Sequence, residues 1–307
     1  MWLRAVWACA LWVVPAWALG APTPATVTIL DGNAIVIREA SKFTVSEGAQ
    51  LVKDDIIETG STGRLVRLEF ADGVILDLGP ESSVLLWPKF GGERGRLPLK
   101  AYLRQGWIKV TMPKGGIAAD AGAVASPAID LAGVTRRVVV SGQAGEAFVF
   151  AESGEATLMD RRNPKARNLL SLKPDDFMSL IGSEPPLLAS RPVAAFMQRI
   201  PRPFLDTIPS RAQRFKGGED TLSPAGNIVY SDVQSWIDAE PSLRSQFVTR
   251  WKSQAQLPEF RKRLVAGLRL HPEWDRTLYP EKYLPKLANR NISGFPASTT
   301  APNASSR

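Results

Sequence analysis

Two short runs in which every second residue is apolar, joined by Asp72-Gly73, constrain the fold more than any other feature of this chain. Apolar side chains alternate through residues 66–70 and again through residues 74–78. An Asp-Gly pair between two runs of period two predicts a β-hairpin with a type I′ turn, in which both central residues have positive φ. The chain therefore contains antiparallel β-structure at this point.

Further short strands are expected between residues 26 and 182, where recurring glycines mark the turns. Many short strands at this spacing favour an all-β sandwich, barrel or β-solenoid. The fold class predicted for residues 26–182 is a mainly β domain, either a curled sandwich or a β-solenoid. The other expected strands are Val27–Leu30, Ala34–Arg38, Ile56–Thr59, Val84–Trp87, Trp107–Thr111, Val138–Val140 and Ala147–Ala151.

The apolar period changes after a proline-rich segment. Residues 183–209 hold six prolines, which predicts a surface linker and an entry segment. Residues 210–288 then repeat apolar side chains at helical spacing, which predicts a smaller all-α domain. Residues 289–307 are mostly small and polar, which predicts a disordered tail.

Local signals place the ends of the predicted helices. A capping box is expected at Ser231-Asp232-Val233-Gln234, and Pro241 and Pro258 are each expected at the first position of a helix. His271-Pro272 is expected to end the last of these helices. Three tryptophans at positions 236, 251 and 274 are interpreted as core anchors rather than as a sugar-binding platform.

The first 18 residues have the pattern of an export signal. Arg4 precedes an apolar stretch from residue 5 to 14, and Ala16-Trp17-Ala18 fits a cleavage site. Cleavage after Ala18 predicts a periplasmic or secreted protein with no transmembrane span thereafter, and an uncleaved anchor is the alternative. Export argues against nucleic acid as a partner.

Charge is distributed unevenly along the 307 residues. Residues 19–184 carry 19 Lys and Arg against 20 Asp and Glu, whereas residues 185–290 carry 17 against 10. This asymmetry predicts an anionic partner for the second half. Arg suits phosphate and carboxylate groups because its planar fork binds them bidentately. The candidate contact residues are Arg261, Lys262, Arg263 and Arg269, for which a merely solvated face is the alternative.

The β half resembles the periplasmic FecR-type domain family. The resemblance rests on Gly32-Asn33-Ala34, Gly48, Asp55–Gly60, Leu68–Gly73 and Leu76–Pro80, in that order and spacing, and extends over roughly residues 26–182. It implies a curled, β-rich domain exposed to the periplasm that acts by protein contact rather than catalysis. Family members that regulate sigma factors carry a cytoplasmic segment and an internal membrane helix, which this sequence lacks, so iron-transport signalling does not carry over.

Residue usage disfavours most catalytic chemistry. The only cysteine is Cys9, in the predicted signal, and the only histidine is His271. Asp72-Gly73 is interpreted as a turn, and Asp54-Asp55 with Glu58 as a solvated acidic turn rather than a calcium site. No catalytic, cofactor-binding or metal-binding residue is predicted.

The sequence thus favours an exported, non-enzymatic FecR-domain protein that binds an envelope protein or an anionic envelope component. The alternative is a cell-envelope hydrolase or carbohydrate-processing enzyme with a site near His271, where Glu273 or Asp275 would orient the imidazole.

Overall fold

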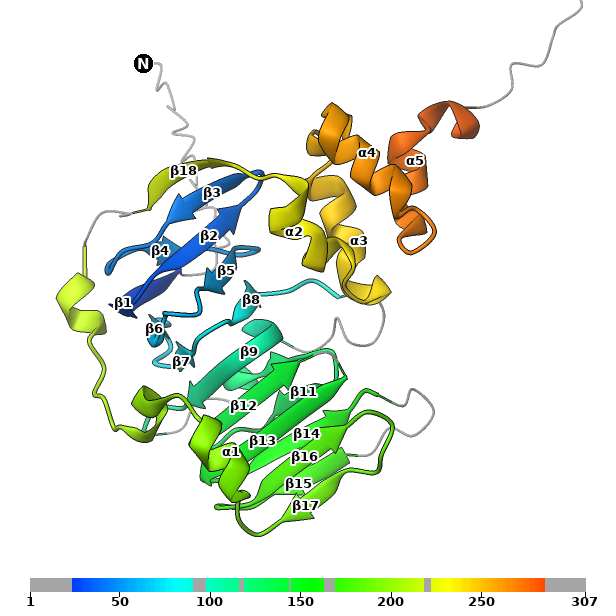
Figure 1. The fold of residues 1–307 in the computed structure, drawn as a ribbon. Helices are drawn as coiled ribbons and strands as arrows, with labels where there is room; N and C mark the ends of the chain where they lie inside the picture. The colour runs from blue at the N-terminus through cyan, green and yellow to red at the C-terminus, as the bar shows by residue number, and fades with distance from the viewer. Residues whose placement is uncertain are drawn as a thin grey trace, which may run out of the picture.

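A computed structural model describes residues 24–90, 98–115, 119–143, 145–162, 169–217 and 222–284 (Figure 1). The predicted signal at residues 1–18 and the predicted tail at residues 289–307 lie outside the described residues. The chain is mainly β, with short helices toward the C-terminus.

One long strand, β9 (Ala101–Thr111), joins two sheets. Its residues 108–111 pair with β7 (Ile75–Leu78) and residues 106–111 with β12 (Arg137–Gln143), whereas residues 101–105 pair with β8 (Ser83–Leu86). Gly106 lies at the bend with a φ of 97°, and a Cβ atom there would lie 2.4 Å from the Ser82 Cα. Only glycine fits this close approach and this backbone conformation.

The first sheet, sheet A, is antiparallel throughout, and β9 lies at its centre. From edge to edge its strands are β4 (Gln50–Leu51), β1 (Ala25–Asp31), β6 (Leu65–Glu69), β7 (Ile75–Leu78), β9, β12 (Arg137–Gln143), β13 (Glu146–Ser153), β16 (Phe177–Ile181) and β17 (Leu187–Ala189).

The second sheet, sheet B, contains one parallel pair, between β9 and β10. From edge to edge its strands are β18 (Ser223–Asn227), β3 (Ser41–Thr44), β2 (Ala34–Arg38), β5 (Ile56–Thr59), β8 (Ser83–Leu86), β9, β10 (Val124–Ala125), β11 (Ile129–Ala132), β14 (Ala156–Asp160) and β15 (Leu169–Leu172).

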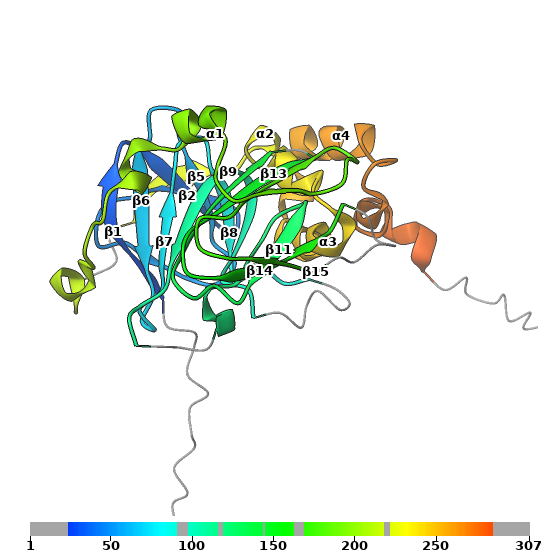
Figure 2. The same ribbon diagram turned by 90° about the horizontal axis from the view of Figure 1, so that it is seen from below.

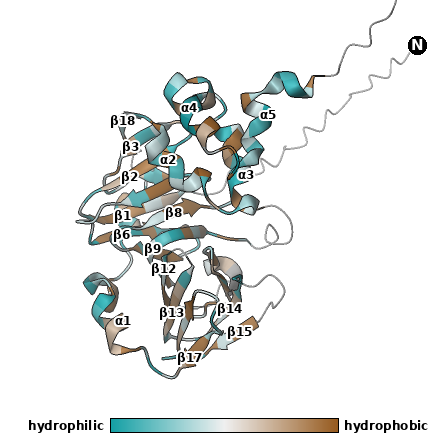
Figure 3. Ribbon diagram, turned by 45° about the vertical axis from the view of Figure 1, so that its right-hand side comes forward, coloured by the Kyte–Doolittle hydropathy of each residue, from teal (hydrophilic) through white to brown (hydrophobic). Residues whose placement is uncertain are grey.

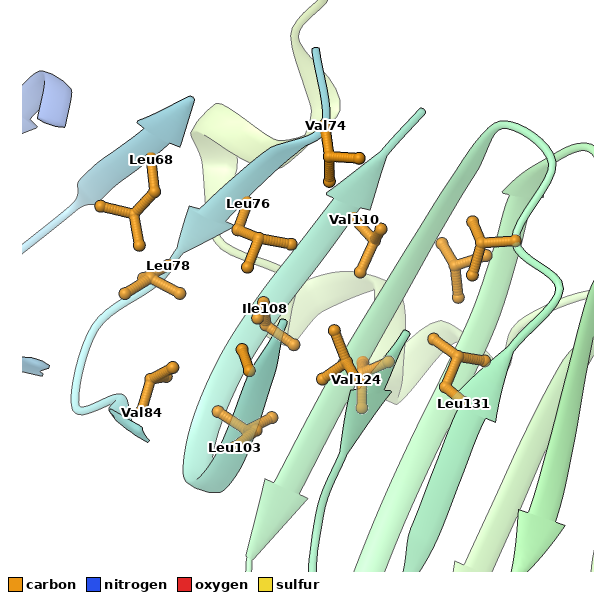
Figure 4. Packing of buried hydrophobic residues seen from close by; sticks show 14 of the residues in the cluster. Leu68, Val74, Leu76, Leu78, Val84, Leu103, Ile108, Val110, Val124 and Leu131 are labelled. Atoms are coloured by element: carbon orange, nitrogen blue, oxygen red, sulfur yellow. The ribbon is translucent and has the colours of Figure 1, made fainter. Parts of the chain in front are cut away.

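The two curled sheets face each other across the main hydrophobic core. Leu68, Leu76 and Ile108 from sheet A meet Val84 and Leu103 from sheet B (Figure 4). The prediction of a mainly β, curled architecture is confirmed, and nearly all pairings among the described strands are antiparallel.

The helices follow the strands in sequence. The α-helices are α1 (Ala194–Arg199), α2 (Tyr230–Ile237), α3 (Pro241–Arg250), α4 (Pro258–Ala266) and α5 (Asp275–Leu278). The 3₁₀ turns are η2 (Ala119–Gly122), η3 (Arg202–Leu205), η4 (Ala212–Phe215), η5 (Gln254–Gln256), η6 (Pro272–Trp274) and η7 (Pro280–Tyr283).

Helices α2–α5 cover the outer face of sheet B, beside the strands (Figure 2). Trp236, Trp251 and Trp274 are buried, as predicted for core anchors, and they belong to a cluster that includes Ile37 and Tyr102 of the sheet. β18 also pairs with β3. The helical part therefore shares a core and a sheet with the β part, and their division at residues 182 and 210 stays a prediction.

Residues 183–195 of the proline-rich segment are mostly exposed, whereas its second part packs against sheet A. Phe196, Ile200 and Phe204 are buried against Trp107 and Phe177. The segment from α1 to η4 leads to the side of the molecule where β1 lies, and η4 contacts β1 (Figure 1). Its prolines suit this path because they stiffen an extended chain.

Buried charges on the outer face of sheet A hold this segment through its backbone. Arg67 Nη1 donates to the Ile208 carbonyl at 2.8 Å, and Lys109 donates to the Phe204 carbonyl. Glu69 accepts from the Arg211 N–H at 2.8 Å and from the Ser210 hydroxyl. Burial acts to raise the pKa of Glu69, but these hydrogen bonds outweigh it and leave the pKa below its ordinary value.

The predicted hairpin is confirmed, but its turn type is wrong. β6 pairs with β7 with Glu69 opposite Ile75. Gly73 has a φ of 83°, whereas Asp72 is not among the residues with positive φ, so the turn is not type I′. The Gly73 N–H donates to the Phe70 carbonyl at 2.9 Å, which closes a longer loop with one left-handed glycine.

Two of the predicted helix boundaries need correction. α3 and α4 begin at Pro241 and Pro258 as predicted, but α2 begins at Tyr230, before the predicted capping box. α4 ends at Ala266 and not at His271-Pro272. Gly267 is the C-cap residue, and a Cβ atom on it would lie 2.5 Å from His271 Cε1, so a larger residue does not fit there.

Candidate functional site

The four predicted contact residues lie together at α4, but they are not equivalent. Lys262, Arg263 and Arg269 are exposed, and their side chains make no hydrogen bond or ion pair among the described residues. Arg261 instead donates to the Leu278 carbonyl, and its guanidinium lies 5.5 Å from the centre of the Tyr279 ring. Arg261 therefore helps to dock α5, and the other three cations form the exposed set, named the α4 face below.

Apolar side chains are exposed within the same stretch of chain. Val265 is 40% exposed and Leu270 is 72% exposed, and both lie between or beside the cations of the α4 face. Figure 3 shows hydrophilic and hydrophobic residues interspersed along α4. The sequence pattern did not single out these two residues, because neither follows the four-residue apolar spacing of Phe260, Leu264 and Leu268.

His271 does not lie in an accessible cleft. Its ring is 1% exposed, Nε2 lies 3.3 Å from the Leu264 carbonyl, and Nδ1 lies 3.4 Å from Asp238 Oδ1. The two carboxylates expected to orient it point elsewhere: Glu273 pairs with Arg244 and Asp275 with Lys282. A general base must reach its substrate, so this geometry gives the catalytic interpretation of His271 no support.

The acidic residues of the sequence analysis have protein partners. Asp72 accepts from the Val74 N–H at 3.2 Å and pairs with Lys100, which agrees with its interpretation as a turn residue. The interpretation of Asp55 as part of a solvated turn is wrong. Asp55 is fully buried and accepts two hydrogen bonds from Arg38, at 2.9 and 2.8 Å. Across the described residues, no three His, Cys, Asp or Glu side chains group as a metal site would require.

A polar groove at the bend of β9 was not expected from the sequence. It has a volume of about 660 Å³ and runs between α2 and the sheets, past Gln105, Ser141 and Ser231. A second hollow of about 710 Å³ adjoins it and shares Arg104, Gln105, Gln143, Ser231 and Ser235 with it. The only signal of this groove in the sequence is Arg104-Gln105, a polar pair in an otherwise apolar stretch of β9.

Two charged side chains form the inner wall of this groove. Glu58 Oε1 accepts from Trp236 Nε1 at 3.3 Å and from Ser83 Oγ at 3.2 Å. Burial raises the pKa of Glu58 in spite of these bonds, and burial likewise lowers the pKa of Arg104. Arg104 Nη2 donates to Gln105 Oε1 at 2.6 Å, whereas its buried Nε has no partner among the described residues.

No described helix has both the length and the apolar character needed to cross a membrane.

Comparison with known proteins gives no family assignment. No model of a protein family matches the chain, and no curated protein matches it. Two solved structures from Parabacteroides distasonis, both described as a "putative anti-sigma factor", are similar to it at 12% and 14% identity, with TM-scores of 0.34 and 0.35. The alignments cover 44% and 47% of this chain, and 59% and 65% of those two chains.

Proposed function

We propose that this protein is an exported, non-enzymatic FecR-like interaction module whose α4 face binds an anionic component of the cell envelope, namely the surface of a membrane with anionic lipids. The observation that carries the proposal is the α4 face: Lys262, Arg263 and Arg269, exposed and without a carboxylate partner among the described residues. The FecR-like part, residues 26–182, would be the scaffold that presents this face.

The exposed apolar side chains favour a bilayer over a purely polar anion. Val265 and Leu270 lie beside the cations, and surface-bound amphipathic segments combine Lys and Arg with apolar residues that enter the boundary between headgroups and acyl chains. Each Lys or Arg near an anionic membrane surface contributes about 1 kcal/mol. The three cations together then contribute about 3 kcal/mol to binding.

Packing keeps the α4 face directed outward. Phe260 and Leu264 are buried on the opposite side of α4, and Arg261 ties the helix to the Leu278 carbonyl. Binding therefore requires no rearrangement of the fold, and the ordering cost on binding is limited to the side chains themselves.

Vesicle binding at two salt concentrations tests the proposal. The full chain should co-sediment with phosphatidylglycerol vesicles and not with phosphatidylcholine vesicles at about 0.01 M salt, where the screening length is about 30 Å. Binding should be lost at about 1 M salt, where that length falls to about 3 Å. Equal binding to both lipids, or binding that salt does not weaken, would show that anionic charge is not what the protein recognises.

A further inference from the structure

A third hollow, of about 590 Å³, lies among the short helices at the C-terminal end of the described chain. Its walls are α3, α5 and the turns η5, η6 and η7, together with residues that directly follow α3 and η7. It shares no lining residue with the groove at the bend of β9. Sites for small molecules have volumes of this order, and this one is named the C-terminal hollow below.

The surface of the C-terminal hollow is largely apolar. Val248 comes from α3 and packs against the helical core, and Pro280 and Tyr283 come from η7. Leu284 follows η7, and the side chains of Tyr283 and Leu284 are exposed. Apolar side chains that are open to water inside a concave site are stabilised when a ligand covers them, so this lining suits an aliphatic chain.

The aromatic wall of the hollow is fixed by its own hydrogen bonds. The Tyr283 hydroxyl donates to Asp275 Oδ2 at 2.6 Å, and Lys282 Nζ donates to Asp275 Oδ1 at 3.0 Å. The Arg276 guanidinium lies 5.7 Å from the centre of the Tyr283 ring. A cation therefore lies beside the apolar wall in the absence of any ligand, and this preorganisation lowers the ordering cost of binding.

The uncompensated charges that line the hollow are positive. Of its charged lining residues, Glu273 pairs with Arg244 at 2.8 Å. Lys252 and Arg276 are exposed, and within the described part of the chain neither side chain has a carboxylate partner. An anionic group that enters the hollow thus meets two free cations and one carboxylate that is already neutralised.

The walls of the hollow do not favour a peptide. Extended peptides commonly add a strand to a free sheet edge, but none of the residues that line this hollow belongs to a strand. A ligand with one anionic group and one aliphatic chain needs no sheet edge.

We infer that the C-terminal hollow binds a single-chain anionic amphiphile, which is an aliphatic chain with a carboxylate or phosphate headgroup. Lys252 and Arg276 contact the headgroup, since charge-assisted hydrogen bonds to such anions are among the strong ones. The chain lies against Val248, Tyr283 and Leu284. The hollow shares no residue with the α4 face, so this inference does not rest on the proposed function.

Titration of the full chain with soluble amphiphiles tests this inference. Laurate and dodecyl phosphate are added separately, each below the concentration at which it forms micelles, and binding is followed by calorimetry. At least one should bind about tenfold more tightly than butyl phosphate, which lacks the long chain, and than dodecyl maltoside, which lacks the charge. Which of the two binds more tightly distinguishes a carboxylate from a phosphate headgroup.

Three results of that titration would overturn the inference. Binding of neither anionic amphiphile would show that the hollow takes no such ligand. Equal binding of dodecyl maltoside would show that the two cations are not recognised. Binding of the acidic peptide acetyl-Glu-Leu-Glu-Leu-amide in place of both amphiphiles would identify a peptide site.

A matched pair of double variants separates the hollow from the α4 face. Lys252→Gln/Arg276→Gln should weaken binding of the anionic amphiphile by about tenfold or more and leave the thermal melt unchanged, because both side chains are exposed. The control, Lys262→Gln/Arg263→Gln, removes the same two residue types from the α4 face and should bind the amphiphile as the wild type does. Equal loss in both would contradict the assignment of the site. Failure of vesicle binding would leave amphiphile binding intact, so this inference and the proposed function fail independently.

A second matched pair tests the contact with the aliphatic chain. Leu284→Ser should reduce the advantage of dodecyl phosphate over butyl phosphate, because it removes apolar surface from the hollow. Leu187→Ser changes a leucine that is exposed to a similar extent on β17 and should leave that advantage as it is in the wild type. An unchanged advantage in both variants would show that the chain does not lie in the hollow.

Discussion

Replacing Asp77 with Asn should lower the free energy of unfolding by about 3–5 kcal/mol, because it leaves a buried guanidinium without its counter-charge. Arg67 and Asp77 are only 5% and 3% exposed, and the two side chains meet through two bonds of 2.6 and 2.9 Å. Arg67 also holds the Ile208 carbonyl. The substitution should therefore loosen the segment that crosses sheet A, and urea denaturation measures the loss.

A second Arg–Asp pair in the same sheet provides the control. Arg64 and Asp31 meet at 2.8 Å, but their side chains are 73% and 37% exposed. Exposed pairs contribute about 0–1 kcal/mol, so Asp31→Asn should change the unfolding midpoint little. Equal losses in the two variants would mean that the burial of Arg67 and Asp77 does not matter, contrary to the packing described above.

Replacing Trp251 with Ala should cost about 3–5 kcal/mol, the range for deleting a buried aromatic side chain. The Trp251 ring stacks on Phe247 with 4.7 Å between ring centres, and its Nε1 donates to the Glu39 carbonyl at 2.9 Å. Arg250 next to it donates to the Ile37 carbonyl at 2.8 Å. These contacts join α3 directly to the turn between β2 and β3.

The number of transitions in the urea unfolding curve tests the division of the chain into two domains. Because the helices share a core with sheet B, we expect a single transition when far-UV circular dichroism and tryptophan fluorescence are both followed. Two transitions, with the helical signal lost first and the β signal retained, would mean that the two parts fold independently, as the predicted boundaries at residues 182 and 210 imply.

Sequence patterns predicted those strands and helices whose own residues favour that structure. The strands at Ala34–Arg38 and Ile56–Thr59 have the predicted limits, because short runs rich in β-branched residues favour strands. Pro241 and Pro258 likewise begin helices, since a proline suits the first helical turn. β18 could not be predicted: all its residues are exposed, and it is held by backbone pairing with β3, which leaves no apolar period.

The same distinction between local and long-range contacts applies to the candidate sites. Clustering in the sequence groups Lys262, Arg263 and Arg269, because one helix and its following turn carry them. It could not show that Arg261 binds Leu278, or that Asp55 is buried with Arg38, because each of those contacts joins segments apart in the chain. The groove depends on β5, β9, β12 and α2 at once, so no single stretch of sequence reveals it.

The measurement that tests the proposed function most directly compares vesicle binding of two charge variants at low salt. Lys262→Gln/Arg263→Gln/Arg269→Gln should lower the partition coefficient on phosphatidylglycerol vesicles by about 100-fold, the equivalent of about 3 kcal/mol. The control, Lys114→Gln/Lys173→Gln/Arg202→Gln, removes three exposed cations elsewhere and should bind nearly as the wild type does. If both variants bind equally, the α4 face is not the membrane-binding surface.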